Sequence, residues 1–200
     1  MKRNKFTIVE SRAVVIPKDN IDTDQIIPAR FLKTTSREGF GKNLFYDWRY
    51  NSSGEKIEDF ILNTSNGEGT ILVAGRNFGC GSSREHAAWA IADYGFRAVV
   101  STFFADIFRS NALNNGLLPV QVSERFYASI INYSKSNNSL ILKIDLMKKQ
   151  ISNPQTDDSE KFEINNYKQD CLINGFDDID YLLSNINEIE EYELYKASSL

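Results

Sequence analysis

The sequence has little cysteine and histidine, no long apolar run and no strong excess of either charge. Its 200 residues include two cysteines, Cys80 and Cys171, and one histidine, His86. The longest unbroken apolar run, 87–92, is far shorter than the roughly 20 residues that a membrane-spanning helix needs. No apolar stretch follows the basic first residues, so no signal peptide is predicted and the cytoplasm is the expected location.

The balance of charges and the scarcity of soft ligands exclude several classes of protein. The chain carries 23 Lys and Arg against 27 Asp and Glu, a net charge of −4 spread along its length. This excludes a basic nucleic-acid-binding protein and an acidic disordered tail. Two cysteines argue against a disulfide scaffold. A zinc or iron–sulfur site needs three or four soft ligands, so we expect this chain to hold no metal by itself.

The spacing of apolar residues predicts an α/β fold. Strands are expected at 7–9, 12–16, 70–74, 97–101, 117–122, 140–145, 148–151 and 161–164. Helices are expected at 82–94, 104–115, 124–134, 167–174 and 179–193. The alternation of strand and helix between 70 and 135 is typical of βαβ units, and the flanking β segments make the sheet mixed. Residues 31–69 are predicted to be mostly irregular, with the aromatic cluster at 45–50 packed against the body.

A glycine-rich segment, GRNFGCGSSREHA at 75–87, follows a predicted strand and leads into a predicted helix. Its glycines allow the backbone to approach a ligand closely. Helix N-termini attract anions, and Ser82 or Ser83 stands where an N-cap is expected. A cation at Arg84 is unfavourable for the helix dipole unless it binds a carboxylate or phosphate through two parallel hydrogen bonds. The segment therefore suggests an anion site.

Two other interpretations of this segment remain open. The first is a serine N-cap on a helix that serves only the core, since 87–92 are apolar on all sides of the helix. The second is a Cys80–His86 nucleophile pair, although no third group is marked to orient it and a lone histidine is more often packed or capping. The segment lacks the third glycine of a dinucleotide site, the lysine of a P-loop and the Gly-x-Ser-x-Gly elbow, which excludes those three sites.

The run NFGCGSSREHA at 77–87 resembles the signature of the aconitase-type swivelling domain. Further stretches resemble that superfamily, or its bacterial 3-isopropylmalate dehydratase small subunits, in the same order: DTDQIIP at 22–28, GFG at 39–41, LFYDWR at 44–49, FFADIF at 103–108, Asn111 and NGLLP at 115–119. The resemblance extends from about residue 5 to the last predicted helix.

The resemblance implies a single three-layer β/β/α swivelling domain over 1–200, with a mixed sheet and a long irregular N-terminal loop. It implies a separate large subunit that carries a [4Fe–4S] cluster, without which the chain is inactive. The implied hydro-lyase reaction interconverts 2-isopropylmalate and 3-isopropylmalate through isopropylmaleate in leucine biosynthesis. The alternatives are a small subunit acting on citraconate, dimethylmalate or homoaconitate, and a non-catalytic anion-binding module.

The resemblance also assigns roles to individual residues. It implies that Ser82 is the base, acting as an alkoxide that the helix N-terminus, the loop N–H groups and Arg84 stabilise. Arg84 would also bind a substrate carboxylate, and Ser83 would donate a further hydrogen bond to it.

Four more residues are candidates, one for substrate binding and three for supporting roles. Arg37 is a candidate second carboxylate clamp, the alternative being a solvated surface arginine. Asp24 either orients groups across the subunit interface or caps a turn. Glu85 and His86 are expected to hold the glycine-rich segment in place without touching the substrate. The stretch 31–40 is expected to face the isopropyl group of the substrate.

Overall fold

The structure, a computed structural model, describes residues 4–33, 39–137 and 139–198. Its strands are β1 Ile8–Ile16, β2 Ile71–Ala74, β3 Ala98–Ser101, β4 Leu118–Gln121, β5 Ile141–Asp145, β6 Gln150–Asn153 and β7 Asp158–Lys161. Its α-helices are α1 Thr23–Ile26, α2 Tyr46–Arg49, α3 Glu85–Tyr94, α4 Asp106–Asn114, α5 Glu124–Ser136, α6 Asn166–Asn174, α7 Asp178–Ser184 and α8 Ile186–Ser198. Short 3-10 turns lie at η1 Ala29–Phe31, η2 Gly41–Asn43, η3 Ile61–Asn63 and η4 Ser65–Gly67.

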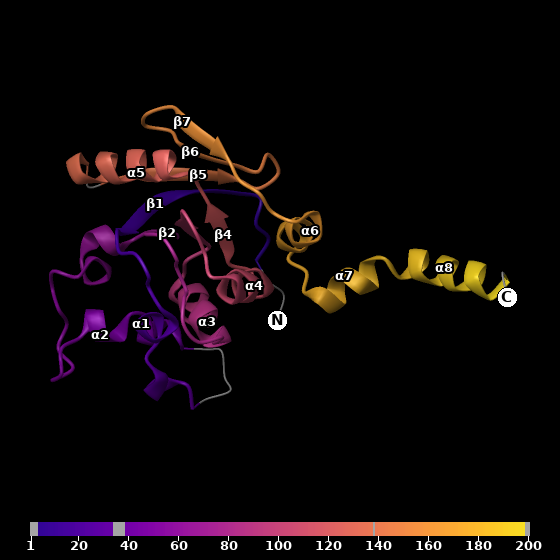
Figure 1. Cartoon of the computed structure of the whole chain (residues 1–200), viewed down its shortest axis with the longest axis horizontal. Coiled ribbons are helices and arrows are strands. Elements are labelled where there is room, and N and C mark those ends of the chain that lie inside the picture. The colour runs from indigo at the N-terminus through magenta and orange to yellow at the C-terminus, as the bar shows by residue number, and fades with distance from the viewer. Residues whose placement is uncertain (1–3, 34–38, 138, 199–200) are drawn as a thin grey trace.

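The strands form one mixed sheet in the order β4-β3-β2-β1-β5-β6-β7 (Figure 1). Strands β1 to β4 are parallel, and β5 to β7 extend the sheet from the other side of β1 by antiparallel pairing. The helices α3 and α4 connect β2 to β3 and β3 to β4, so the predicted βαβ units are confirmed. Strand β2 is buried along its whole length, as its unbroken apolar sequence predicts.

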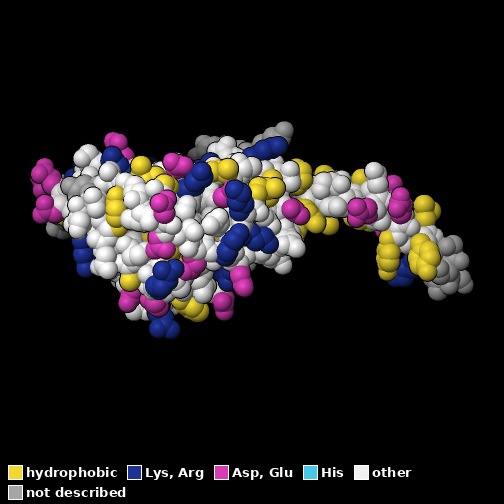
Figure 2. All heavy atoms as spheres, turned by 90° about the horizontal axis from the view of Figure 1, so that it is seen from above, with side chains coloured by type: hydrophobic (Ala, Val, Ile, Leu, Met, Phe, Trp, Pro, Cys, Tyr) yellow, Lys and Arg dark blue, Asp and Glu magenta, His cyan; other side chains and the backbone are white. Residues whose placement is uncertain are grey.

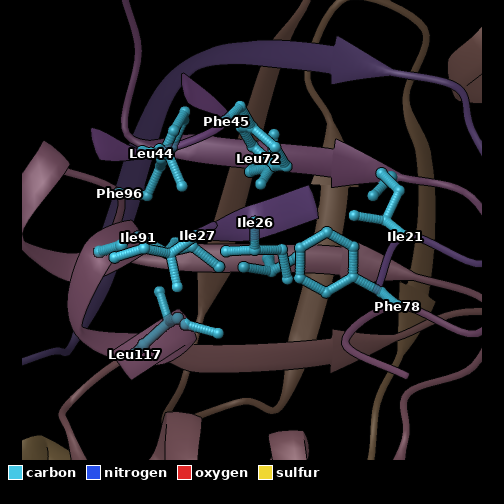
Figure 3. Packing of buried hydrophobic residues seen from close by; sticks show 14 of the residues in the cluster. Ile21, Ile26, Ile27, Leu44, Phe45, Leu72, Phe78, Ile91, Phe96 and Leu117 are labelled. Carbon is cyan, nitrogen blue, oxygen red and sulfur yellow. The ribbon is translucent and has the colours of Figure 1, made fainter. Parts of the chain in front are cut away.

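Two apolar clusters cover the two faces of the parallel half of the sheet. Leu72 and Ala74 of β2 belong to the cluster beneath α1, α3 and α4, part of which is drawn in Figure 3. Ile71 and Val73 point the other way and share a cluster with β5, β6, α5 and α6. The antiparallel half therefore packs against one face of the parallel half while helices cover the other, which gives the expected β/β/α layers.

The described part of 31–69 carries short helical turns, and its aromatic segment is packed whereas residues 51–59 are exposed. Phe45 is fully buried, and its ring stacks on Trp48 with 5.0 Å between the ring centroids. The buried guanidinium of Arg49 donates hydrogen bonds to the carbonyl oxygens of Lys42 (3.2 Å) and Leu44 (3.3 Å). The expectation that the aromatic cluster packs against the body is confirmed.

Some predicted strands and helices differ from the structure. The strands expected at 7–9 and 12–16 form the single strand β1. The strand expected at 161–164 lies earlier in the chain, as β7 at Asp158–Lys161. This edge strand has the polar sequence DSEK and pairs with β6 through its backbone, so it lacks the apolar alternation by which strands are recognised. The single helix expected at 179–193 is interrupted at Asn185, where α7 ends before α8 begins.

Helices α7 and α8 form a C-terminal arm that extends away from the body (Figures 1 and 2). Large apolar side chains of this arm are exposed: Ile179 and Leu183 keep 63% and 61% of their surface accessible. The arm is attached to α6 by an ion pair between Lys168 Nζ and Asp178 Oδ1 at 2.9 Å. Among the described residues, no helix has the length and apolar character needed to cross a membrane.

Candidate active site

The glycine-rich segment 75–84, called the glycine loop below, lies at the carboxyl ends of the parallel strands. The N–H of Gly79 donates to the carbonyl oxygen of Ile21, in the connection that follows β1, at 2.7 Å. On the other side, the N–H of Phe78 donates to the carbonyl oxygen of Phe103, just after β3, at 3.1 Å. The ring of Phe78 is fully buried in the core cluster (Figure 3), so the loop is anchored from three directions.

Left-handed backbone conformations shape the glycine loop. Asn77, Gly79 and Gly81 have φ values of 61°, 74° and 92°. A Cβ at Gly79 would overlap the ring of Phe108, so only glycine fits there without a shift of α4. Asparagine adopts this conformation more readily than most other residues with a side chain. The side-chain amide of Asn77 donates a hydrogen bond to Asn20 Oδ1 at 2.9 Å.

The predicted serine N-cap was wrong. Helix α3 begins at Glu85 with Arg84 as its N-cap, and no side chain donates or accepts a capping hydrogen bond there. Ser82 and Ser83 precede the helix and are exposed. A three-residue turn lies here instead, in which the N–H of Arg84 donates to the carbonyl oxygen of Ser82 at 2.7 Å. The amino end of α3 thus keeps the partial positive charge that favours an anion.

Asp24 contacts the glycine loop directly. Its Oδ1 forms an ion pair with Nη1 of Arg84, whose side chain is 23% exposed. The turn-capping role belongs to Asp22 instead, which accepts from the N–H of Gln25 at 2.7 Å in a capping box on α1. Asp24 therefore does not cap the turn but pairs with Arg84 of the same chain, and a role across the subunit interface stays a prediction.

Glu85 and His86 both contact the surrounding scaffold. Glu85 Oε1 accepts a hydrogen bond from Asn115 Nδ2 at 2.9 Å, which joins the start of α3 to the end of α4. The ring of His86 lies 4.5 Å from that of Trp89 and 5.5 Å from that of Phe40, between ring centroids. These contacts fit the supporting roles expected of the two residues.

The environment of Cys80 does not favour a nucleophilic thiolate. Burial, and secondarily the negative charge of Asp22, raises the pKa of the Cys80 thiol above its usual range. A reactive cysteine needs the opposite shift. The imidazole of His86 packs against aromatic rings, as described above, so the geometry gives the Cys80–His86 pair no support.

Two further predictions concern Arg37 and metal binding. Arg37 lies outside the described residues, and its role as a second carboxylate clamp stays a prediction. Over the described ranges, no group of three or more His, Cys, Asp or Glu side chains could hold a metal ion. Cys80 in the glycine loop and Cys171 on α6 are not joined by a disulfide. The donor set therefore does not fit an iron–sulfur cluster held by this chain.

Comparisons with known proteins agree with this geometry. A family model described as the aconitase C-terminal domain matches residues 3–125. The 3-isopropylmalate dehydratase small subunit of Cytophaga hutchinsonii is 60% identical over 189 residues, covering 94% of each chain. That of Christiangramia forsetii is 54% identical over 94% of this chain and 92% of its own. This chain belongs to the 3-isopropylmalate dehydratase small-subunit family.

A solved structure supports the same family at the level of the fold. The crystal structure of 3-isopropylmalate dehydratase (LeuD) from Methanocaldococcus jannaschii matches with a TM-score of 0.64 and 30% sequence identity. The match covers 96% of this chain and 99% of the other. The expected swivelling-domain fold and the expected family are thereby confirmed.

Two residues at the site were not singled out from the sequence. Thr23 is buried, and its hydroxyl donates to the carbonyl oxygen of Ser82 at 3.1 Å. Asn115 holds Glu85, as described above. Both residues lie in stretches that carry the family resemblance, so the sequence marks their positions. It does not show their contacts, because Thr23 is 59 residues from Ser82 and Asn115 is 30 residues from Glu85.

Proposed function

We propose that this chain is the small subunit of a hydro-lyase that interconverts 2-isopropylmalate and 3-isopropylmalate through isopropylmaleate in leucine biosynthesis. The observation that carries the proposal is the placement of Ser82 and Arg84. Ser82 is exposed and lies two residues before Arg84, the N-cap of α3, whose guanidinium pairs with Asp24. That arrangement suits a dicarboxylate whose C–H proton must be removed.

Ser82 is the proposed base. In the dehydration direction its alkoxide takes the proton from the carbon beside a carboxylate, the C–H electron pair becomes the new C=C bond, and hydroxide leaves the neighbouring carbon. A serine alkoxide needs stabilisation, which the partial positive charge at the start of α3 and the guanidinium of Arg84 supply. The exposure of Ser82 supports this role, because a substrate can reach the hydroxyl.

Arg84 and Ser83 are proposed to bind the substrate carboxylate. Asp24 engages Nη1 of Arg84, which leaves the remaining N–H groups of the fork to bind a carboxylate. Ser83 is exposed beside it and can donate a further hydrogen bond. Arg37 is the proposed clamp for the second carboxylate of the substrate, with Glu85 and His86 supporting the loop.

The proposal requires a partner. Departure of hydroxide calls for a Lewis acid, and we place the [4Fe–4S] cluster on the large subunit, since the donor set of this chain does not fit one. We assign no step to a metal held by this chain. The chain is proposed to act as one swivelling domain over 1–200. Its two cysteines form no disulfide with each other, which suits a reducing compartment and supports the cytoplasm as its location.

The test is the Ser82→Ala variant in the complex with the large subunit. Dehydration is followed through the absorbance of the conjugated diacid. Removal of a general base lowers kcat by about 10²- to 10⁴-fold. Ser83→Ala is the matched control, an exposed neighbouring serine whose loss should raise KM about tenfold and change kcat little.

Three outcomes would count against the proposal. Turnover of Ser82→Ala near the wild-type rate removes Ser82 as the base. Binding of a dicarboxylate by the wild-type complex without turnover favours a non-catalytic anion-binding module. Faster turnover of citraconate, dimethylmalate or homoaconitate than of isopropylmalate assigns the chain to a related hydro-lyase.

A further inference from the structure

Three consecutive residues at the start of α1 contact the glycine loop at successive points. Asp22 forms an isolated parallel β-bridge with Cys80. The N–H of Thr23 donates to the carbonyl oxygen of Cys80 at 2.9 Å, and the Thr23 hydroxyl donates to the carbonyl oxygen of Ser82 at 3.1 Å. Asp24 pairs with Arg84. The segment 22–24 therefore lies along the glycine loop and contacts every second residue from Cys80 to Arg84.

Thr23 is the buried member of this segment. Only 2% of its surface is exposed, whereas the side chain of Asp24 is 53% exposed. The capping box between Asp22 and Gln25 fixes the first turn of α1, and Ile26 on that turn is fully buried in the core. A β-branched residue has few χ1 rotamers, so the Thr23 hydroxyl is held toward the loop.

The carbonyl group of Ser82 connects the rigidly held Thr23 to the candidate active site. It accepts two hydrogen bonds, from the Thr23 hydroxyl and from the N–H of Arg84. Because the peptide unit is planar, fixing this oxygen fixes the peptide plane between Ser82 and Ser83. The directions of both serine side chains depend on that plane.

We propose that Thr23 is a positioning residue for Ser82, acting through the hydrogen bond from its hydroxyl to the Ser82 carbonyl oxygen. The inference rests on the proposed function, because it assigns Thr23 a part in the same reaction. Thr23 touches no reacting atom. It sets the direction in which the Ser82 hydroxyl meets the substrate, while Arg84, which binds the carboxylate, has a separate support in Asp24.

The test compares Thr23→Val with Thr23→Ser in the complex with the large subunit. Valine keeps the volume and the branch but removes the donor, whereas serine keeps the donor. Thr23→Val is expected to lower kcat about tenfold with KM within about twofold, since misplacement of a reacting group affects the chemical step. Thr23→Ser is expected to stay within about threefold of wild-type kcat.

A control threonine and a second measurement separate positioning from general stability. The hydroxyl of Thr64 donates a hydrogen bond to the carbonyl oxygen of Ile61 at 2.8 Å. Thr64 precedes β2 in the chain, whereas the glycine loop follows it. Thr64→Val should leave kcat unchanged. In the full chain alone, amide hydrogen exchange of the Arg84 N–H, which shares the Ser82 carbonyl, should be several-fold faster in Thr23→Val than in Thr23→Ser.

The outcomes are distinguishable. Wild-type kcat in Thr23→Val, or equal loss in Thr23→Val and Thr23→Ser, overturns the positioning role. A KM increase without a fall in kcat also overturns it, because substrate binding rather than base placement would then be affected. If the wild-type complex dehydrates no isopropylmalate, the proposed function fails, while the exchange of the Arg84 amide still tests the contact itself.

Discussion

Asp24 and Arg84, 60 residues apart in the chain, form an ion pair between the first turn of α1 and the N-cap of α3. The pair joins two of the stretches that carry the family resemblance. It also explains why a cation stands at the start of a helix, where the dipole disfavours it. The carboxylate offsets that cost and holds the guanidinium in place just before the first turn of α3.

The Asp24→Asn substitution tests this relationship. The pair is partly exposed, so its loss should change the free energy of unfolding by less than about 1 kcal/mol. Arg84 would lose its orienting partner and pay more conformational entropy on binding, so KM should rise about three- to tenfold. Steady-state kinetics of the complex and urea unfolding of the chain measure the two effects.

A second ion pair provides the control for Asp24→Asn. Glu10 and Lys143 lie 3.7 Å apart, are comparably exposed, and link β1 to β5 away from the glycine loop. Glu10→Gln should leave both KM and kcat unchanged. A lower KM in Asp24→Asn would contradict the orienting role, because it would mean that Asp24 competes with the substrate for Arg84.

The glycine loop should be intolerant of Gly79→Ala. The residue has φ of +74°, and its new Cβ would overlap the ring of Phe108. The left-handed conformation alone costs about 1–2 kcal/mol for alanine, and the overlap adds about 1–3 kcal/mol. Urea unfolding measures the sum. Gly54→Ala is the matched control, since Gly54 has φ of +82° with nothing within 4 Å. Equal losses in the two variants would show that the contact with Phe108 does not matter.

Much of this fold is encoded in local sequence patterns. The apolar sequence of β2 predicts a strand buried on both faces, and Gly95 at φ of 114° ends α3 where a helix stop is expected. Local patterns failed where backbone pairing or a turn decides the structure. The polar strand β7 depends on its partner β6, and the turn from Ser82 to Arg84 displaces the helix start by three residues.

The site was less predictable than the fold for a related reason. The residue types in 75–87 indicate an anion site, and the resemblance assigns their roles. The contacts that orient Ser82 and Arg84 come from Thr23 and Asp24, about 60 residues earlier in the chain. Pairings between separate segments depend on the packed core that brings α1 to α3, and no local spacing contains them.

The Cys80 thiol should react slowly at neutral pH. Burial raises its pKa, so the fraction of reactive thiolate at pH 7 is smaller than in a free thiol. The rate at which iodoacetamide alkylates Cys80 should still increase with pH in the range where the alkylation rate of glutathione has already reached its maximum. Cys80→Ser is the control that identifies the reacting group, since Cys171 is buried. Rapid alkylation at pH 7 would contradict this environment.

The same shift gives a pH dependence of stability with a definite sign. A thiol whose pKa is higher in the folded chain binds its proton more tightly there. The thiol's contribution to the free energy of unfolding is complete at pH values below its pKa in the unfolded chain. It is lost as the pH rises through the pKa of the thiol in the folded chain. The urea midpoint of the wild type should therefore fall more steeply than that of Cys80→Ser in the alkaline range.

Deletion of the C-terminal arm should leave the body of the chain folded. Among the described residues after Phe176, none is buried, and the attachment to α6 consists of exposed or half-exposed contacts such as Lys168–Asp178. A chain that ends at Phe176 should lose less than about 1 kcal/mol of unfolding free energy, since exposed ion pairs contribute little. It should also aggregate less, because the deletion removes exposed apolar side chains such as Leu183.

A longer deletion provides the contrast. A chain that ends at Asn165 also loses α6, whose Leu172 is buried in the cluster beneath the antiparallel half of the sheet. The carbonyl oxygen of Leu172 accepts a hydrogen bond from the N–H of Phe6 at 2.9 Å, so the N-terminal segment would lose its anchor as well. Removal of one large buried apolar side chain costs about 2–5 kcal/mol. Urea unfolding should therefore separate the two deletions clearly, and equal midpoints would mean that the boundary of the stable body is not at α6.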